Sequence, residues 1–228
     1  VTIERAGDVI PHVVLVDIKK RKKNSKKFIF PLNCPSCGSK TIKDYNEVTK
    51  KQDVIRRCVS EGYECEKIAI EKIKHFVSKD ALNIDGFGKK IVENFWNLKL
   101  IKLPQDIFNL NYSKIEKLEG WGKLSVANLQ FSIEEKKIIS LEKFIYSLGI
   151  RHIGQENAKL IAKHLKKTVN FFKLTNEKNI ESLSNINGIG DTQIQSIKKF
   201  FLNKTNLKVL SGLEYNLVIK NMTLIDNE

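Results

Sequence analysis

Four cysteines are the side chains of this chain whose type and spacing best suit a metal ion. They are Cys34, Cys37, Cys58 and Cys65. The first two form a Cys-x2-Cys knuckle, whose tight turn directs both thiolates to one side of a Zn²⁺ ion, and Pro35 and Gly38 suit such a turn. The second pair, with six intervening residues, is spaced more widely than the usual separation of roughly two to four, so the first knuckle is the stronger signal. We predict that the second pair completes a tetrahedral zinc site.

Other roles for these cysteines fit the sequence less well. Disulfides are disfavoured in a reducing compartment, and a redox-active dithiol would need a neighbouring βαβ pattern, which is absent. His75 follows ten residues after Cys65 and is an alternative ligand, but four thiolates already suffice. We therefore interpret His75, like His12 and His164, as a surface or packing residue. A site closed by four thiolates has no open coordination position, so the zinc would be structural and would contribute about 10 kcal/mol or more to local folding.

A second pattern recurs four times and is built around glycine. Its last glycine is Gly88, Gly122, Gly154 or Gly190, at intervals of 34, 32 and 36 residues. An apolar residue precedes each of these glycines, and further apolar residues stand four residues before, four after and seven after each one. Such spacing predicts two short helices whose apolar stripes are separated by a glycine hairpin. Free N–H groups at the start of the second helix would then form a site suited to phosphate.

The third copy departs from the pattern, and a different repeat class must also be considered. Three copies read Gly-hydrophobic-Gly, whereas the third has His152 in place of the first glycine, so we expect its hairpin to be shaped differently or to bind less tightly. A helical solenoid of the tetratricopeptide kind has a period close to this one. That class does not need a glycine pair at the turn and has a different signature, so it is the weaker interpretation.

The four copies resemble the helix-hairpin-helix motif of DNA-binding proteins, in which hairpin amides contact the phosphate backbone without reading base sequence. By this resemblance, neighbouring cations add to the amides. The implied DNA-binding residues are Gly86, Phe87, Gly88, Lys89, Lys90, Gly120, Gly122, Lys123, Arg151, Gly154, Gly188 and Gly190.

The composition agrees with a polyanionic partner. Forty Lys and Arg against 26 Asp and Glu give a net charge of +14, which favours nucleic acid over a membrane because no basic amphipathic anchor helix is visible. Abundant Asn, Ile and Lys also fit the codon bias of an AT-rich genome, which would raise the charge without any function. No apolar run approaches about 18 residues and no signal peptide is visible, so we expect a cytoplasmic protein. The chain begins with Val1 and has one methionine, Met222, so we expect a fragment or a trimmed protein.

The pattern along the chain predicts a mainly α protein in four parts. Residues 1–31 alternate as a few strands, too few to be stable alone. Residues 32–66 hold the cysteines. Residues 67–202 have helical periodicity and contain the four hairpins. Residues 203–228, rich in Asn and Lys, are expected to be a linker or tail.

Taken together, these parts resemble the C-terminal portion of a bacterial NAD-dependent DNA ligase. Besides the hairpins, the resemblance rests on the strings Arg5-Ala-Gly-Asp-Val-Ile-Pro11, His75-Phe-Val-Ser78 and Leu148-Gly-Ile-Arg-His-Ile-Gly154. It implies that residues 1–31 are the closing strands of an oligonucleotide-binding barrel (OB-fold), residues 32–66 a four-cysteine zinc finger, and residues 67–202 a helix-hairpin-helix domain. The implied partner is nicked double-stranded DNA near the bacterial nucleoid, and the implied process is nick sealing in replication and repair.

The same resemblance shows what the chain lacks. The family's nucleophile is the lysine of a Lys-x-Asp-Gly motif, but the similar string here, Asn83-Ile-Asp85-Gly86, has an amide that cannot act as an amine nucleophile. Catalytic residues are therefore expected to be absent, and NAD would bind only to an adenylation domain outside this chain. We expect the chain to be inactive alone and to act with a separate catalytic segment. The alternative is a non-catalytic interaction module of a DNA-repair complex.

Overall fold

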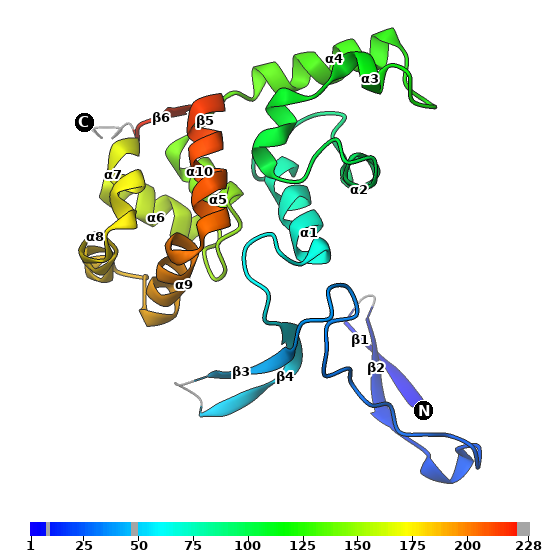
Figure 1. Ribbon diagram of the computed structural model, residues 1–228. Coiled ribbons are helices and arrows are strands. Elements are labelled where there is room, and N and C mark those ends of the chain that lie inside the picture. Colours follow the sequence, from blue (N-terminus) through cyan, green and yellow to red (C-terminus); the bar gives the residue numbers. More distant parts are fainter. Residues whose placement is uncertain (8–9, 47–49, 223–228) are drawn as a thin grey trace.

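The computed structural model describes residues 1–7, 10–46 and 50–222. It consists of an N-terminal part made of two β-ribbons and a larger body made of short helices (Figure 1). The mainly α prediction is confirmed. No helix of the described residues is both long enough and apolar enough to cross a membrane.

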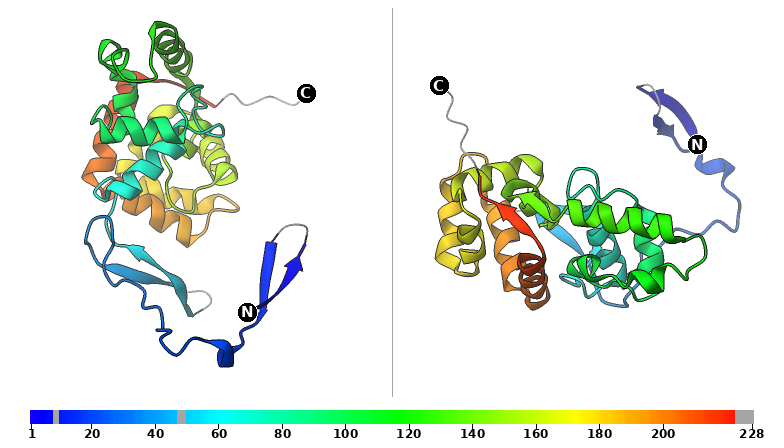
Figure 2. Two further views of the ribbon diagram at one scale, coloured as in Figure 1. Left: turned by 90° about the vertical axis from the view of Figure 1, so that its right-hand side faces the viewer. Right: turned by 90° about the horizontal axis from the view of Figure 1, so that it is seen from above.

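The first β-ribbon is formed by β1 (Thr2–Ala6) and β2 (Ile10–Leu15), which pair antiparallel. A short 3-10 helix, η1 (Ile18–Lys20), follows, and residues 21–31 form no further strand. Every described residue from 1 to 33 whose side-chain burial is given is exposed, and Ile29 is 82% exposed. Both views of Figure 2 show this ribbon projecting away from the helices. A lone two-stranded ribbon buries little apolar surface, so it gives a third strand little to pack against.

The second β-ribbon follows the turn that contains Cys34 and Cys37, and it ends at Cys58. β3 (Thr41–Asn46) and β4 (Lys51–Cys58) pair antiparallel, with Thr41 opposite Cys58. The chain then turns into α1 (Glu66–Val77), whose N-cap is Cys65. The last cysteine therefore directly precedes the first helix.

The helical body contains four hairpins, each between two helices. The first lies between α1 and α2 (Lys89–Asn97), the second between α3 (Tyr112–Ile115) and α4 (Lys123–Glu135), the third between α5 (Leu141–Ser147) and α6 (Gln155–Leu165), and the fourth between α8 (Glu177–Glu181), extended by η4 (Ser182–Asn185), and α9 (Asp191–Leu202). The connections are η2 (Pro104–Asn109), β5 (Ile138–Ser140), and α7 (Thr168–Phe172) with η3 (Lys173–Thr175).

The repeated apolar positions form the core of this body, as the register predicts. The residues four and seven positions after each last glycine are all buried: Val92, Phe95, Val126, Leu129, Ala158, Ile161, Ile194 and Ile197. They belong to one hydrophobic cluster that runs through all four motifs. Because each short helix buries only a narrow stripe, the stability of the motifs comes from packing against one another rather than from helix propensity.

Residues 203–222 are ordered and packed, so the prediction of a linker or tail is wrong for them. Asn203 caps α10 (Lys204–Asn216) by accepting a 2.9 Å hydrogen bond from the Asn206 N–H, and the helix buries Val209, Leu210 and Leu213. After α10, β6 (Val218–Lys220) pairs parallel with β5. The Asn- and Lys-rich composition concealed an apolar stripe of helical period. Residues 223–228 lie outside the described residues.

Candidate metal centre and nucleic-acid interface

The four cysteines converge on one point. Their sulfur atoms all lie within 4.8 Å of one another, with 3.5 Å between the sulfurs of Cys37 and Cys58 and 4.0 Å between those of Cys34 and Cys65. Four sulfurs placed tetrahedrally at about 2.3 Å from Zn²⁺ would be about 3.8 Å apart, so the arrangement fits this ion. The wider spacing of the second pair is explained by the elements that hold it, since Cys58 ends β4 and Cys65 caps α1.

Local hydrogen bonds shape the knuckle and favour the thiolate form. The N–H of Gly38 donates to the carbonyl oxygen of Cys34 at 2.8 Å, and Gly38 has a φ of +75°, which favours glycine. Hydrogen bonds from Ser39 and Ser60 lower the pKa of Cys37 to about 5. A thiolate is the form that ligates a metal, so this cysteine needs little help to lose its proton at neutral pH.

His75, the alternative ligand, has a different role. Its Nε2 lies 2.8 Å from the carbonyl oxygen of Tyr146, and its ring packs edge-on against the Tyr146 ring. The side chain therefore joins α1 to α5, as a packing residue would.

The four hairpins have the same backbone turn. In each, the N–H of the apolar residue donates to the carbonyl oxygen three residues earlier: Phe87 to Ile84 at 3.2 Å, Trp121 to Leu118 at 3.1 Å, Ile153 to Ile150 at 3.0 Å, and Ile189 to Ile186 at 3.0 Å. The third residue of each turn has a positive φ, namely 78° at Gly86, 79° at Gly120, 62° at His152 and 96° at Gly188. A turn with positive φ at this position is of type II. The expectation that the third hairpin is shaped differently is wrong, because His152 adopts the conformation of the glycines.

Phe87 does not fit its predicted place among the DNA contacts. Its side chain is only 1% exposed and packs on the Phe95 ring with a centroid distance of 5.5 Å, while its N–H is used within the turn. Apolar residues at this position anchor the hairpin to the core. The amides that remain available to a ligand belong to the last glycine and to the first turn of the next helix.

Those amides differ in availability among the hairpins. The N–H of Gly122 donates to Ser125 Oγ at 2.9 Å, and the N–H of Gly190 donates to Gln193 Oε1 at 3.2 Å. Within the described residues, the corresponding N–H groups of Gly88 and Gly154 have no such side-chain acceptor. The first and third hairpins therefore present one more open donor than the second and fourth.

The charges around the hairpins differ as well. Lys89, Lys90 and Lys123 are exposed and form no ion pair with any described residue, so they remain available to an anion. The first turn of α6 contains Glu156 and that of α9 contains Asp191, which oppose an anion there. The sequence prediction passed over these two acids, although their positions two residues and one residue after the last glycine were readable.

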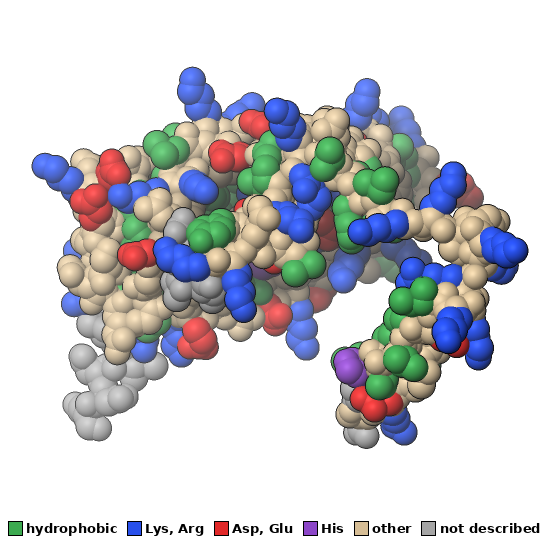
Figure 3. All heavy atoms as spheres, turned by 90° about the horizontal axis from the view of Figure 1, so that it is seen from below, with side chains coloured by type: hydrophobic (Ala, Val, Ile, Leu, Met, Phe, Trp, Pro, Cys, Tyr) green, Lys and Arg blue, Asp and Glu red, His purple; other side chains and the backbone are tan. Residues whose placement is uncertain are grey.

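Arg151, a predicted DNA contact, is already paired. Its guanidinium forms an ion pair with the carboxylate of Asp44 in β3. Oδ2 of Asp44 also lies 3.5 Å from Nη1 of Arg57. No sequence signal linked Asp44 to this hairpin, because the two residues come from different elements. More generally, Lys and Arg side chains are spread over the face shown in Figure 3, with fewer acidic side chains among them.

Comparisons with known proteins agree with both the hairpins and the chain as a whole. A family model described as helix-hairpin-helix motif matches residues 143–210, which span the third and fourth hairpins. The chain is 84% identical, over 227 residues, to a DNA ligase of Pelagibacter ubique, covering 100% of this chain and 34% of that protein. It is 41% identical to a DNA ligase of Rickettsia canadensis and 38% identical to one of Parvibaculum lavamentivorans, covering 93% of this chain in both cases and 32% and 31% of those proteins.

The chain thus spans about a third of the length of the curated relatives that it matches. The match extends from the β-ribbons through the cysteines to the last hairpin, and it therefore covers every part of the chain on which the motif resemblance was based. Along its whole length, the chain is related to a portion of bacterial DNA ligases, and the family resemblance drawn from its motifs is confirmed.

Proposed function

We propose that this chain is the DNA-binding, C-terminal portion of an NAD-dependent DNA ligase and that it holds nicked duplex DNA for sealing during replication and repair. One observation carries the proposal: four hairpins with the same turn present helix N-termini at the surface of a chain that is related to DNA ligases throughout. On this proposal the chain acts in the bacterial cytoplasm, at the nucleoid.

The residues of the chain would bind DNA through its backbone. Amides in the first turns of α2, α4, α6 and α9 would donate to phosphate oxygens, and Lys89, Lys90 and Lys123 would add charge. None of these groups distinguishes one base from another, so binding would follow duplex geometry. Affinity would fall with salt, with a logarithmic slope of about −0.9 for each phosphate neutralised.

Catalysis would come from a segment outside this chain. The chain contains no Lys-x-Asp-Gly string; the similar string Asn83-Ile-Asp85-Gly86 has an amide, which cannot form the adenylated intermediate of an amine. We therefore expect neither AMP transfer from NAD nor nick sealing by this chain alone. The chain's own contribution would be to bind and orient the substrate.

Zinc is the metal that we propose for the four-cysteine centre. The sulfur distances fit tetrahedral Zn²⁺, and four thiolates are a ligand set that zinc commonly has in structural sites. Bound zinc would hold the knuckle, the end of β4 and the start of α1 together. Metal analysis should find one zinc per chain, and removal of zinc should unfold residues 32–65 while the helical body keeps its circular dichroism. A metal-free protein with an ordered second ribbon would contradict this proposal.

DNA binding is tested by fluorescence anisotropy with a labelled nicked duplex, the same duplex intact, and a nicked duplex of scrambled sequence, each at several salt concentrations. We expect tighter binding to the nicked duplexes, no effect of sequence, and a steep salt dependence. Sealing should appear when the remaining two-thirds of the Pelagibacter ubique ligase is added. Absence of binding at low salt by a folded, zinc-loaded sample would overturn the proposal.

The exposed apolar side chains of the N-terminal segment, residues 1–33, favour a second function, that of a protein-interaction module in a DNA-repair complex. Ile10 and Phe28 are each 71% exposed, and apolar side chains gathered in this way commonly mark a surface covered by another protein segment. Under the ligase proposal, the ligase's own preceding segment would cover them. Binding of the added ligase segment to the chain in the absence of DNA would favour the ligase assignment.

A further inference from the structure

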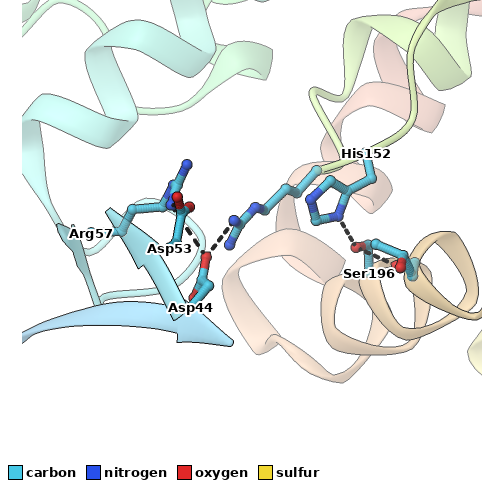
Figure 4. A network of polar contacts seen from close by, with 7 residues as sticks. Asp44, Asp53, Arg57, His152 and Ser196 are labelled. Carbon is cyan, nitrogen blue, oxygen red and sulfur yellow. Dashed lines mark hydrogen bonds and ion pairs between the residues drawn. The ribbon is translucent and has the colours of Figure 1, made fainter. Parts of the chain in front are cut away.

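The contact between Arg151 and Asp44 joins two parts of the molecule that are far apart in sequence. Arg151 lies in the third hairpin, and Asp44 lies on β3 of the zinc-bearing ribbon. Figure 4 shows Asp44 beside Arg57 and facing the loop that carries His152. The two paired side chains are 52% and 32% exposed, so solvent and other ions have access to them.

The third hairpin is held in place independently of this contact. The Ser196 hydroxyl donates to the carbonyl oxygen of Thr192 at 2.8 Å, so its oxygen accepts the 3.0 Å hydrogen bond from His152 Nδ1. This bond ties the hairpin to α9. If the ion pair with Arg151 opened, the zinc-bearing ribbon would move and the hairpin would stay.

Asp44 also has a second cation. Arg57, which is bonded to Asp53 in the same ribbon, lies 3.5 Å from Asp44. Release of Arg151 would therefore leave Asp44 with a partner rather than with an uncompensated charge. An exposed ion pair whose acid has a second partner is inexpensive to break.

We propose that Asp44 is an internal phosphate mimic that occupies Arg151 until duplex DNA displaces it, which frees the zinc-bearing ribbon from the third hairpin. A carboxylate and a phosphate both present oxygen pairs to the same guanidinium donors, so Arg151 cannot serve both fully at once. The contact is then autoinhibitory: it lowers DNA affinity by the free energy of the pair. This inference rests on the proposed function, and it adds an order of events to DNA binding.

The test compares variants of the 228-residue chain in the nicked-duplex anisotropy assay at about 0.1 M salt. Asp44→Asn should tighten binding about two- to fivefold, the range that exposed ion pairs provide. Asp53→Asn is the matched control, because it makes the same charge change in the same ribbon at a residue that pairs with Arg57 and not with Arg151. Equal effects of the two substitutions, or weaker binding by Asp44→Asn, would overturn the proposal.

A double-mutant cycle isolates the pair. Arg151→Gln removes both the phosphate contact and the competing contact, so it should cost less affinity in the wild-type background than in the Asp44→Asn background. The difference should match the gain caused by Asp44→Asn alone. Equal reductions in the two backgrounds would show that Asp44 and Arg151 act independently and would contradict the proposal.

A second measurement does not depend on DNA binding. Spin labels on non-canonical residues at Gln52 of β4 and Lys159 of α6, both exposed, report the distance between ribbon and helical body. Without DNA, we expect a narrow distance distribution in the wild type and a broad one in Asp44→Asn, with Asp53→Asn resembling the wild type. An unchanged distribution in Asp44→Asn would refute the internal contact. If neither the wild type nor any variant bound DNA in the anisotropy assay, the proposed function would be refuted instead.

Discussion

The first two hairpins and the last two have the same turn but different surroundings. Lys89, Lys90 and Lys123 follow the glycines of the first pair, whereas Glu156 and Asp191 follow those of the second pair. Arg151, a cation of the second pair, is engaged by Asp44. All four turns nevertheless close with hydrogen bonds between 3.0 and 3.2 Å.

This difference shows that the residues that form the hairpin turn are not the residues that set its affinity for an anion. The turn depends on positive φ at one position, which is present four times, and on an apolar anchor, which is buried at Phe87, Ile153 and Ile189 and partly buried at Trp121. The electrostatic potential at the helix N-terminus depends on exposed side chains that the turn does not need. Under the proposed function, we therefore expect the first pair to provide most of the phosphate affinity and the second pair mainly to position the DNA.

The largest effect is expected from the lysines of the first hairpin. The double substitution Lys89→Gln/Lys90→Gln should weaken binding to a nicked duplex by on the order of tenfold for each phosphate that the chain no longer neutralises at about 0.1 M salt, and should make the salt slope shallower by about 0.9 per phosphate. Anisotropy at several salt concentrations measures both. Lys204→Gln/Lys208→Gln on α10 is the control with the same charge change at two exposed lysines. A similar weakening in the control would mean that net charge, not the first hairpin, sets the affinity.

A substitution within the turn should instead reduce stability. Gly120→Ala places a Cβ at a φ of +79° with no atom within 4 Å, so the cost is conformational, about 1–2 kcal/mol. Thermal unfolding should show a lowered Tm. Gly88→Ser is the control, since this residue has a φ of −73° and serine is favoured at a helix N-cap. Equal destabilisation by the two substitutions would contradict the role assigned to positive φ.

The acceptors of the second and fourth hairpins should have smaller effects. Ser125→Ala removes the bond from the Gly122 N–H and should lower the free energy of unfolding by about 0.5–1 kcal/mol. DNA affinity should stay the same or rise, because the freed amide can then donate to phosphate. Gln193→Ala tests the fourth hairpin in the same way. A large loss of affinity in the folded Ser125→Ala variant would show that Ser125 itself contacts DNA.

The smallest effect is a pH dependence confined to the third hairpin. Burial, followed by the nearby Arg151, lowers the pKa of His152 from its usual 6.5. A group with a lowered pKa in the folded state stabilises the fold above its unfolded pKa, and this contribution is lost as the pH falls below about 6.5. The decrease in Tm between pH 7.5 and pH 5.5 should therefore be slightly smaller for His152→Asn than for the wild type. Identical decreases would show that His152 does not contribute.

The sequence predicted those features that depend on short-range rules. Spacing identified the knuckle of Cys34 and Cys37, and the two remaining cysteines of the chain completed the set despite their wider spacing. The glycine register identified the four turns and their buried apolar positions, because both follow from φ and from helical period. Phe87 was misplaced among the DNA contacts, since a residue between two exposed glycines can still point into the core.

Other features were missed because they depend on tertiary contacts or because composition concealed the pattern. The pairing of Asp44 with Arg151 joins residues 107 positions apart. His152 was expected to alter its hairpin, but histidine is one of the residues that tolerate a positive φ when neighbours hold it there. The helix α10 was concealed by composition, although its packed face includes Val209, Leu210 and Leu213.

The last helix and strand have a consequence for how four weak contacts combine. Helix α10 packs against α9 and against η2, β6 pairs with β5 between the two hairpin pairs, and the Val218 N–H donates to the carbonyl oxygen of Lys137 at 2.7 Å. The final segment thereby fixes one hairpin pair relative to the other. For the DNA binding proposed above, contact of one hairpin with DNA would hold the other three at a fixed distance from the same duplex. The local concentration of these three hairpins near the DNA would then be high, so the four weak contacts would act as one multivalent binding surface.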